Sequence, residues 1–585
     1  MDWMWGKRMK TRMSFQSEIS DQSAQRFSFY DHLSECRSPS EVLDLACRST
    51  STDRQVSNCL TRCWVTTKKM PENQRQYELG LMFEHVGFED LLQKTMKNAR
   101  SMRTEDLTHS LLAIVRLGVS QRSRVVQTLF RVCQENLNEM NERSLSRLMT
   151  CLEHVERSPN GDALKDGVRL IIEAKLPRVQ NVMALQTMMR HVGRDASVEL
   201  KKKIERKALS LACQFTLPNS QYMVTTLASM GFCSKPLLDI CSKNIAEQVG
   251  GIPFNRLYYV LKACRELFYR DLCLFTAISD HVGSSIAMWN NRQVILILSA
   301  FEDLAFCPTA ILDAFAERVI GDPDALGFKD VFSVLKSYSS LNHDLQARRV
   351  PFLECMTHVA ESYLPKMDVF NLLKVVYYLC QLNYFPPALL QQLLQQETLD
   401  QIANQGGRLQ MGMEKKLQMV DLCLKLDQPS LPNSLAVSLQ SLRLSAPNKH
   451  VVNPRLSLIL QSMTQDWLLE EGVVVEDHYF IDGVLQEATE GHATSDEENS
   501  LPEQRIAVFC APPSSICYGT SRPRGKLAVK IRHLKVLGYA PVVFSEHELD
   551  SLSEDERKEF VLSQVFPKQE SIAHVKPKTE GPAEM

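Results

Sequence analysis

The middle of this chain repeats at a spacing of about one helical hairpin, and this repeat limits the possible folds more than any other feature. An apolar residue recurs at successive spacings of 38, 37, 38, 37, 37, 37 and 41 residues, in segments such as LLAIVRLGV, VTTLASMGF and VLKSYSSLNH. We call these residues the anchors: Leu117, Val155, Val192, Met230, Leu267, Leu304, Leu341 and Leu382. A fixed period of this length is typical of helical units that stack into a solenoid.

Each repeat unit has the pattern of two amphipathic helices. The residues three and six positions before each anchor are apolar, with Gln186 the one polar exception, and this spacing lays one apolar stripe along a helix. A second helical pattern follows, as in PTAILDAFAERVI and PPALLQQLLQQ, and its prolines suit a helix start. We therefore predict a mainly α fold, with an α-solenoid of hairpins over residues 76–402.

One position in the repeat differs in chemistry from the apolar stripe beside it. Five residues before the anchors stand Leu112, Thr150, Thr187, Thr225, Lys262, Ser299, Lys336 and Tyr377. In helical-repeat RNA readers, side chains at a fixed repeat position contact one base each. Two interpretations stay open: Thr225, Lys262, Ser299 and Lys336 contact RNA, or this position is the solvent-facing flank of the first helix.

The overall charge of the chain does not indicate nucleic-acid binding, so any basic surface has to be local. Lys and Arg number 67 and Asp and Glu 69, which gives a formal net charge of −2. The 17 cysteines include no C-x-x-C pair, so we expect reduced thiols and no metal site. No apolar run approaches the roughly 20 residues that span a bilayer. The basic start MDWMWGKRMKTRMSF is similar to a transit segment within an N-terminal region over 1–75, and whether residues 1–30 are cleaved stays open.

The sequence after residue 402 changes from repeats to a strand–helix–strand order. We expect a helical connection over 403–470, from the patterns MEKKLQMVDLCLKL and NPRLSLILQSMTQDWLL. VVVEDHYFIDGVL, RIAVFC and APVVFS are typical of strands, and this order predicts a small α/β domain over 471–566. An acidic loop is expected over 486–504, and a disordered tail over 567–585.

The helix of this small domain carries the densest basic cluster of the chain. The segment GKLAVKIRHLKVLGY is expected to form a helix whose buried face is Leu527, Ile531 and Leu534. Its cations flank this face on both sides. The candidate RNA-contacting residues are Arg522, Arg524, Lys526, Lys530, Arg532, His533 and Lys535. Either these residues contact phosphates, or they solvate the helix and meet acidic residues such as Glu546 and Glu548. Gly538 is expected to end the helix in a left-handed conformation.

Three segments carry a resemblance to a known family. RGKLAVKIRHLKVLGYAPVVFSEHEL resembles the RAP domain, which is similar to a degenerate restriction-endonuclease-like fold. NRLYYVLKACRELFYRDLCLFTAISDHV and LLKVVYYLCQLNYFPP resemble the two modules of the FAST kinase domain-containing family, expected near 255–320 and 335–425. The resemblance covers roughly residues 220–565.

The resemblance implies an RNA-binding protein of the mitochondrial matrix and its RNA granules, acting in transcript processing, stability, translation or ribosome assembly. Its implied partners are mitochondrial rRNA or mRNA and other RNA-granule or ribosome-assembly proteins. The segment ICYGTSRPRGKLAVKIRHL narrows the resemblance to a group for which large-subunit ribosomal RNA and mitoribosome assembly are implied.

The residues do not support catalysis. The chain has no Gly-rich phosphate loop, no V-A-I-K lysine, no HRD and no DFG, so we expect no kinase activity. Asp482 could match the first carboxylate of a nuclease, but RIAVFCAP supplies no second one. We therefore expect no catalytic residue, no metal and no cofactor, in a protein that binds RNA. The alternative is a helical-repeat scaffold that binds proteins without contacting RNA.

Overall fold

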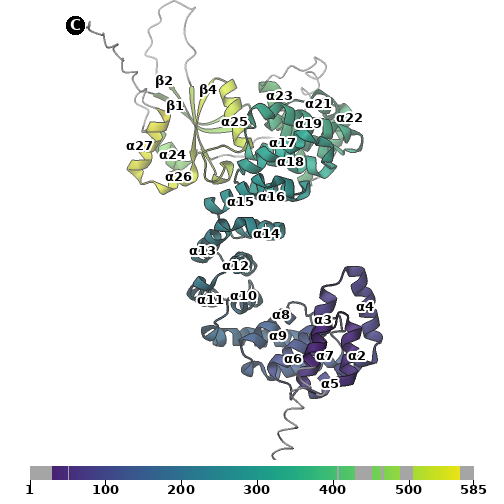
Figure 1. Ribbon diagram of the computed structural model, residues 1–585. Helices are drawn as coiled ribbons and strands as arrows, with labels where there is room; N and C mark the ends of the chain where they lie inside the picture. Colours follow the sequence, from purple (N-terminus) through teal and green to yellow (C-terminus); the bar gives the residue numbers. More distant parts are fainter. Residues whose placement is uncertain are drawn as a thin grey trace, which may run out of the picture. The chain divides into compact units, whose positions relative to one another are not determined.

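The computed structural model describes residues 29–49, 52–404, 407–427, 451–462, 467–487 and 505–566 (Figure 1). The predicted transit segment at the very N-terminus, nearly all of the acidic loop and the predicted disordered tail lie outside these residues. The chain divides into two compact units at Ile245 and Ala246, and the short segment Glu266–Tyr269 belongs with the first unit.

The first unit consists of helical hairpins in which each helix packs on the corresponding helix of the next hairpin. Helix α6 packs on α8, α8 on α10 and α10 on α12, while α7 packs on α9. The packing also continues before residue 76, because α3 contacts α6 and α5 contacts α7. The helices are α2 (Pro39–Ser49), α3 (Asp53–Lys68), α4 (Glu72–Glu84), α5 (Val86–Asn98), α6 (Thr104–Arg116), α7 (Arg124–Glu135), α8 (Glu142–Leu152), α9 (Pro159–Lys175), α10 (Val182–Val192), α11 (Val198–Ser210), α12 (Leu217–Met230) and α13 (Lys235–Glu247).

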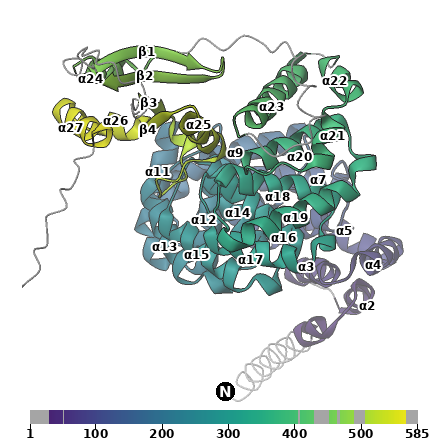
Figure 2. The ribbon, with the colours of Figure 1, turned by 90° about the horizontal axis from the view of Figure 1, so that it is seen from above.

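The second unit, taken by itself, has the same kind of helix packing. Helix α16 packs on α18 and α18 on α20, while α15 packs on α17 and α17 on α19, so the predicted helical solenoid is confirmed (Figure 2). Helix α23 then packs on α20. These helices are α14 (Phe254–Glu266), α15 (Leu272–Ser284), α16 (Asn291–Asp303), α17 (Thr309–Gly321), α18 (Phe328–Leu341), α19 (Arg349–Ser362), α20 (Val369–Gln381), α21 (Pro387–Leu393), α22 (Gln396–Ala403) and α23 (Gly407–Leu426).

The anchors lie at or just after the end of the first helix in each hairpin, and all except the half-buried Leu382 are buried. Every residue three or six positions before an anchor is buried as well. This includes Gln186, whose Nε2 donates a hydrogen bond to the backbone oxygen of Asn219 at 2.7 Å. The stripe predicted from sequence is therefore the contact surface between neighbouring hairpins.

A left-handed residue follows the anchor in all repeats except the one at Val155. These residues, with φ between 48° and 91°, are Gly118, Gly193, Gly231, Phe268, Ala305, Asn342 and Asn383. In such a turn the N–H groups that follow the helix bond back to carbonyl groups of its last turn, as the N–H of Phe306 does to the oxygen of Phe301 at 3.0 Å. The first helices of most repeats therefore end in the same kind of turn.

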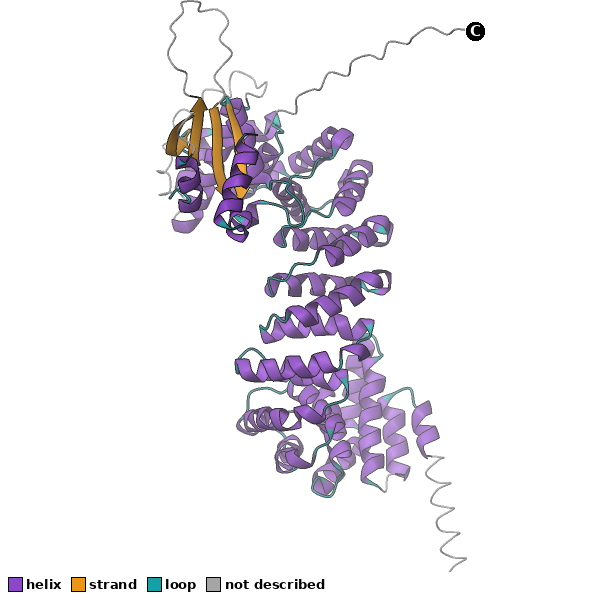
Figure 3. Cartoon of the chain, turned by 90° about the vertical axis from the view of Figure 1, so that its left-hand side faces the viewer, coloured by secondary structure: helices purple, strands orange, loops and turns teal. Residues whose placement is uncertain are grey.

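The C-terminal part is a four-stranded sheet in the order β1-β2-β3-β4 (Figure 3). The β1/β2 and β2/β3 pairs are antiparallel, and β3/β4 is parallel with α25 as the connecting helix. The elements are α24 (Pro454–Gln461), β1 (Trp467–Val475), β2 (Tyr479–Glu487), β3 (Arg505–Ala511), α25 (Gly525–Val536), β4 (Tyr539–Ser545), α26 (Glu546–Ser551) and α27 (Glu554–Val565). The predicted small α/β domain after helical repeats is confirmed.

Each face of this sheet has its own apolar core. One core joins the sheet to α24, α26 and α27 through residues such as Leu460, Val508 and Phe544. The other joins it to α25, where Leu527 and Leu534 pack against strand residues. Helix α25 is therefore held against the sheet by its apolar face.

The helical prediction over NPRLSLILQSMTQDWLL is too long. Helix α24 ends at Gln461, and Trp467 already begins β1, so WLL is strand rather than helix. Partly buried and exposed residues alternate over Trp467–Glu470, which is the period of a strand with one covered face. The short apolar run WLL is compatible with both the helix and the strand period. Its backbone pairing with β2 makes it a strand.

Candidate nucleic-acid interface

The loop that precedes α25 lies against the ends of two repeat helices. The backbone N–H of Tyr518 donates to the oxygen of Ala305 at 2.7 Å. In the next repeat, the Asn342 side chain donates to the oxygen of Pro523 at 3.2 Å. Ala305 and Asn342 are two of the left-handed residues that follow anchors. The turns that end the repeat helices therefore form the docking surface for the α/β domain.

Arg524 makes a buried ion pair with the end of α16. Its Nη2 lies 2.7 Å from Oε1 of Glu302, and the same oxygen accepts a hydrogen bond from Ser340 Oγ at 2.8 Å. The other carboxylate oxygen, Oε2, accepts one from Lys336 Nζ at 2.6 Å. Burial by itself raises the pKa of Glu302, but these hydrogen bonds and the two positive charges outweigh it, so the pKa lies below its ordinary value. Glu302 is therefore a carboxylate that joins α16, α18 and the α/β domain.

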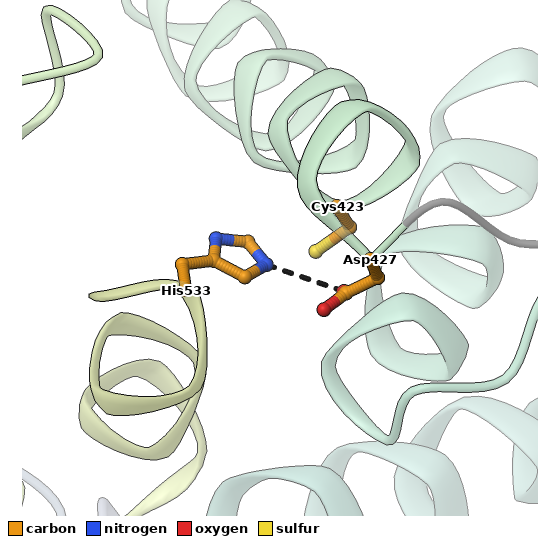
Figure 4. A group of neighbouring side chains, drawn as sticks. All are labelled: Cys423, Asp427 and His533. Carbon is orange, nitrogen blue, oxygen red and sulfur yellow. Dashed lines mark hydrogen bonds and ion pairs between the residues drawn. The ribbon is translucent and has the colours of Figure 1, made fainter. Parts of the chain in front are cut away.

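Arg532 makes a second ion pair, with Asp427 at the end of α23, and Figure 4 shows this aspartate with its neighbours Cys423 and His533. Arg532 Nε and Nη2 lie 2.9 and 2.7 Å from the two carboxylate oxygens of Asp427. His533 Nε2 lies 3.2 Å from the same carboxylate, and Tyr479 OH lies 2.6 Å from His533 Nδ1. Arg532 also donates to the oxygens of Cys380 and Gln381, at the end of α20. Arg532 thus places a positive charge at the C-terminal end of α20, where the helix dipole favours it.

The donor atoms of Cys423, Asp427 and His533 lie within 4.8 Å of one another, which is a spacing that a metal ion could use. The chemistry fits a metal poorly. The guanidinium of Arg532 already occupies both carboxylate oxygens of Asp427. Burial raises the pKa of the Cys423 thiol to about 12, so the sulfur keeps its proton at neutral pH. We interpret the cluster as a buried ion pair that fixes α25 on α23.

Arg522 and Lys530 also have partners within the second unit. Arg522 Nη1 lies 3.1 Å from Nδ1 of His343. Lys530 Nζ donates to the oxygen of Phe480 at 2.5 Å and lies 3.5 Å from the ring centroid of Phe509. Burial lowers the pKa of Lys530 to about 8, partly offset by the charge of Asp482.

The carboxylate of Asp482 is buried and binds backbone groups. It accepts hydrogen bonds from the N–H groups of Asn453 and Cys510, both at 2.8 Å. These bonds join the start of α24 and the end of β3 to β2. The position that resembles a nuclease carboxylate therefore has a structural role in this fold.

The other predicted RNA-contacting residues are dispersed. Lys526 and Lys535 are exposed on α25, and Lys262 is exposed on α14. Ser299 is half-buried on α16. Thr225 belongs to the first unit, and its hydroxyl donates to the oxygen of Tyr222 in its own helix at 3.0 Å. The position five residues before the anchors therefore contains both exposed cations and side chains bonded within the protein.

Lys336, Arg524 and Lys526 line one cavity of about 870 Å³, which we call the lysine cavity. Its walls come from α18, α20, α23, the turn between β1 and β2, and the start of α25. Its other lining residues include Glu302, Ser340, Tyr377, Tyr378, Gln381, Met411, Glu414, Lys415, Lys416, Gln418, Asp477 and His478. The candidate interface thus includes residues from both the helical repeats and the α/β domain.

Sequence reasoning missed Lys415, Lys416 and Tyr378 as site residues. The lysine pair in MEKKLQ was visible but lay in a segment assigned to a plain helical connection. Tyr378 follows Tyr377 in the pattern VVYYLC, in which the apolar stripe is the dominant signal. Nothing in that pattern indicates that Tyr378 lines a cavity. No local spacing relates residue 378 to residue 416 or 526, so only the fold brings them together.

Comparisons with known proteins agree on one group of relatives. The model of "FAST kinase-like protein, subdomain 1" matches residues 331–403. The chain is 34% identical over 539 residues to human FAST kinase domain-containing protein 2, mitochondrial, covering 91% of this chain and 75% of that protein. The mouse protein of the same name is 35% identical over 541 residues, covering 91% and 77%. Human FAST kinase domain-containing protein 3, mitochondrial, is 22% identical over 560 residues, covering 92% and 83%.

Proposed function

Because this chain belongs to the FAST kinase domain-containing family, we propose that it is a mitochondrial protein that binds RNA and acts in RNA metabolism after transcription. The predicted resemblance to this family, and to its second member in particular, is confirmed. The names of the relatives place those proteins in mitochondria, which supports the same location for this one. The described helices include none long and apolar enough to cross a membrane.

The observation that carries the proposal is a division of the cations near α25 into two sets. Arg524, Arg532 and His533 join the α/β domain to the repeat helices through buried carboxylates. Lys526 and Lys535 are exposed, and no ion pair among the described residues involves them. The first set fixes the helix, so the second is held in place with its charge available. Exposed lysines on a helix that is held in place suit contact with a phosphate backbone, and Lys526 shares its cavity with Tyr378.

The finer assignment follows the family resemblance. We propose binding to large-subunit ribosomal RNA and a role in mitoribosome assembly, with mitochondrial mRNA processing or stability as a related activity. The location would be the matrix and its RNA granules, with other RNA-granule or ribosome-assembly proteins as partners. Binding rather than catalysis is proposed, because Asp482 is committed to backbone donors and Lys530 is covered by Phe509.

Ultraviolet crosslinking in mitochondria, followed by sequencing of the bound RNA at nucleotide resolution, tests this function. We expect reads concentrated in mitochondrial RNA, with large-subunit rRNA the most enriched. A protein scaffold is the alternative, and it predicts background crosslinking together with partners that remain bound after ribonuclease treatment. That second result would replace RNA binding by protein binding as the function.

A further inference from the structure

The lysine cavity has more positive than negative charge. Lys336 and Arg524 share the buried carboxylate of Glu302, which leaves this carboxylate saturated. The remaining cations on the wall are Lys415, Lys416 and Lys526, and the remaining carboxylates are Glu414 and Asp477. Excess positive charge in a concave site attracts anions more strongly than the same charge on a flat surface.

Lys416 is the cation whose surroundings most favour an anion. Its half-buried Nζ donates to the oxygen of Gly412 at 3.1 Å, and no ion pair within the described ranges involves it. Burial lowers the pKa of Lys416, and the positive charges of Lys526 and Lys374 lower it further. A bound phosphate between Lys416 and Lys526 would relieve this repulsion.

The start of α25 adds to this field. Gly525, Lys526 and Leu527 line the cavity, and Arg524 at the N-cap makes no side-chain capping bond to the first N–H groups of the helix. The positive end of a helix dipole favours a phosphate at this place. This effect supplements the lysines, which provide the full charges.

The same cavity contains an aromatic wall. Tyr378 is half-buried and lines the cavity, and its ring centroid lies 5.4 Å from that of Tyr377, which is buried behind it. Tyr377 OH accepts a hydrogen bond from Gln381 at 2.7 Å, which holds this pair in place. Bases stack on such rings with little sequence preference. The cavity volume of about 870 Å³ lies within the range of roughly 300–1,000 Å³ of small-molecule sites.

We propose that the lysine cavity binds one nucleotide of single-stranded RNA, with its phosphate between Lys416 and Lys526 and its base against Tyr378. This assignment rests on the proposed RNA-binding function and gives that function a site. Helices α20 and α23 supply the aromatic ring and one lysine, and α25 of the α/β domain supplies the other lysine. RNA binding at this site would therefore need both parts of the second unit in their docked arrangement.

The test measures binding of the full chain to a short fluorescein-labelled single-stranded RNA of mixed sequence, by fluorescence anisotropy. Lys416→Ala and Lys526→Ala together should weaken binding at least tenfold at low salt. Lys558→Ala, which removes an exposed lysine from α27, should change the affinity less than twofold. All variants should keep the wild-type melting temperature within a few degrees, because no ion pair among the described residues involves these lysines.

The base contact has its own pair of variants. Tyr378→Leu removes the ring and should weaken RNA binding by roughly 5- to 100-fold, the range for loss of one stacked base. Tyr378→Phe keeps the ring and should bind like the wild type. Crosslinking of the wild-type complex with peptide mapping should place the nucleotide adduct in α20.

The outcomes separate the site from the function. If the wild type binds RNA and both the lysine and the Tyr378→Leu variants bind equally well, the RNA site lies elsewhere and the cavity assignment is wrong. If the wild type does not bind RNA above a control protein, the proposed function itself fails. Displacement of the labelled RNA by micromolar AMP or UMP would also overturn the assignment, since it would mark a site for free nucleotides.

Discussion

The guanidinium group of Arg532 lies against the carboxylate of Asp427 in a two-point arrangement, with Nε–Oδ1 and Nη2–Oδ2 distances of 2.9 and 2.7 Å. The two residues are separated by 105 positions in the chain. Together with the pair formed by Arg524 and Glu302, this contact joins the α/β domain to the repeat helices. Part of the basic cluster in GKLAVKIRHLKVLGY thus has a structural explanation, since it caps helix ends.

Asp427→Ala should destabilise the second unit and loosen its α/β domain. Removal of one partner from a buried pair leaves an uncompensated charge, and because Arg532 is partly exposed we expect the lower end of the usual cost, about 3 kcal/mol. Hydrogen–deuterium exchange should rise in α25 and at the ends of α20 and α23. The control is Glu354→Ala, which removes an exposed carboxylate from α19 and should leave exchange in α25 unchanged. Equal exchange in both variants would contradict the structural role of Asp427.

Acid should weaken the same junction. Burial alone would raise the pKa of Asp427 and of Glu302, but their hydrogen bonds and the facing cations Arg532, His533, Lys336 and Arg524 lower both below the ordinary values of 3.8 and 4.5. The unfolded chain then binds more protons than the folded one, so this stability is present above about pH 4.5 and is lost as the pH falls through the lowered pKa values. Thermal melts between pH 7 and pH 3 should record the loss.

The matched variant for this titration is Glu302→Gln combined with Asp427→Asn. It removes both ionisable groups, so its melting temperature should be lower than that of the wild type at pH 7 and should fall less between pH 5 and pH 3. A variant whose pH profile runs parallel to the wild type would show that other carboxylates cause the acid sensitivity.

The anchors and the position five residues before them should respond differently to substitution. Leu304→Ala removes a buried side chain from the contact between hairpins and should cost about 2–5 kcal/mol of unfolding free energy. Lys262→Ala removes an exposed side chain and should change stability by less than about 0.5 kcal/mol. If Lys262 also contacts RNA, its substitution should lower affinity while urea melts stay unchanged. Wild-type affinity would identify this position as a solvated flank.

Substitution of two glycines of the α/β domain should be destabilising for different reasons. Gly538 has a φ of 83°, as predicted from its place after α25, and has open space around it, so Gly538→Val should cost about 1–3 kcal/mol through backbone strain. A Cβ atom at Gly525 would overlap the backbone oxygen of Ser339 on α18, so the added methyl group of Gly525→Ala would collide with it. Limited proteolysis should show the α/β domain released from α18 in the second variant and partly unfolded in the first.

The repeat and its buried stripe could be predicted because period and polarity are local properties of the chain. The left-handed turns were partly visible in Gly118, Gly193 and Gly231, where a glycine removes the steric cost. Ala305 has a positive φ of 58° without that signal, so its turn could not be predicted from the residue type.

The functional arrangement could not be read from the sequence. Arg524 and Arg532 appeared as a surface cluster beside Lys526, since nothing in a single helix indicates which cation meets Glu302 or Asp427 far away in the chain. Lys416 and Tyr378 were missed for the same reason. Contacts with residues far away in the chain decide which cations are paired and which stay exposed. The local spacing of the cations does not indicate these contacts.

The most direct test of the central claim is the salt dependence of RNA affinity for the full chain and for Lys526→Ala. If Lys526 contacts a phosphate, the slope of log affinity against log salt should fall by roughly 0.7, the loss of one contact on a single strand, with the melting temperature unchanged. An unaltered slope in a folded variant would contradict this prediction, because it would remove Lys526 from the RNA-binding surface.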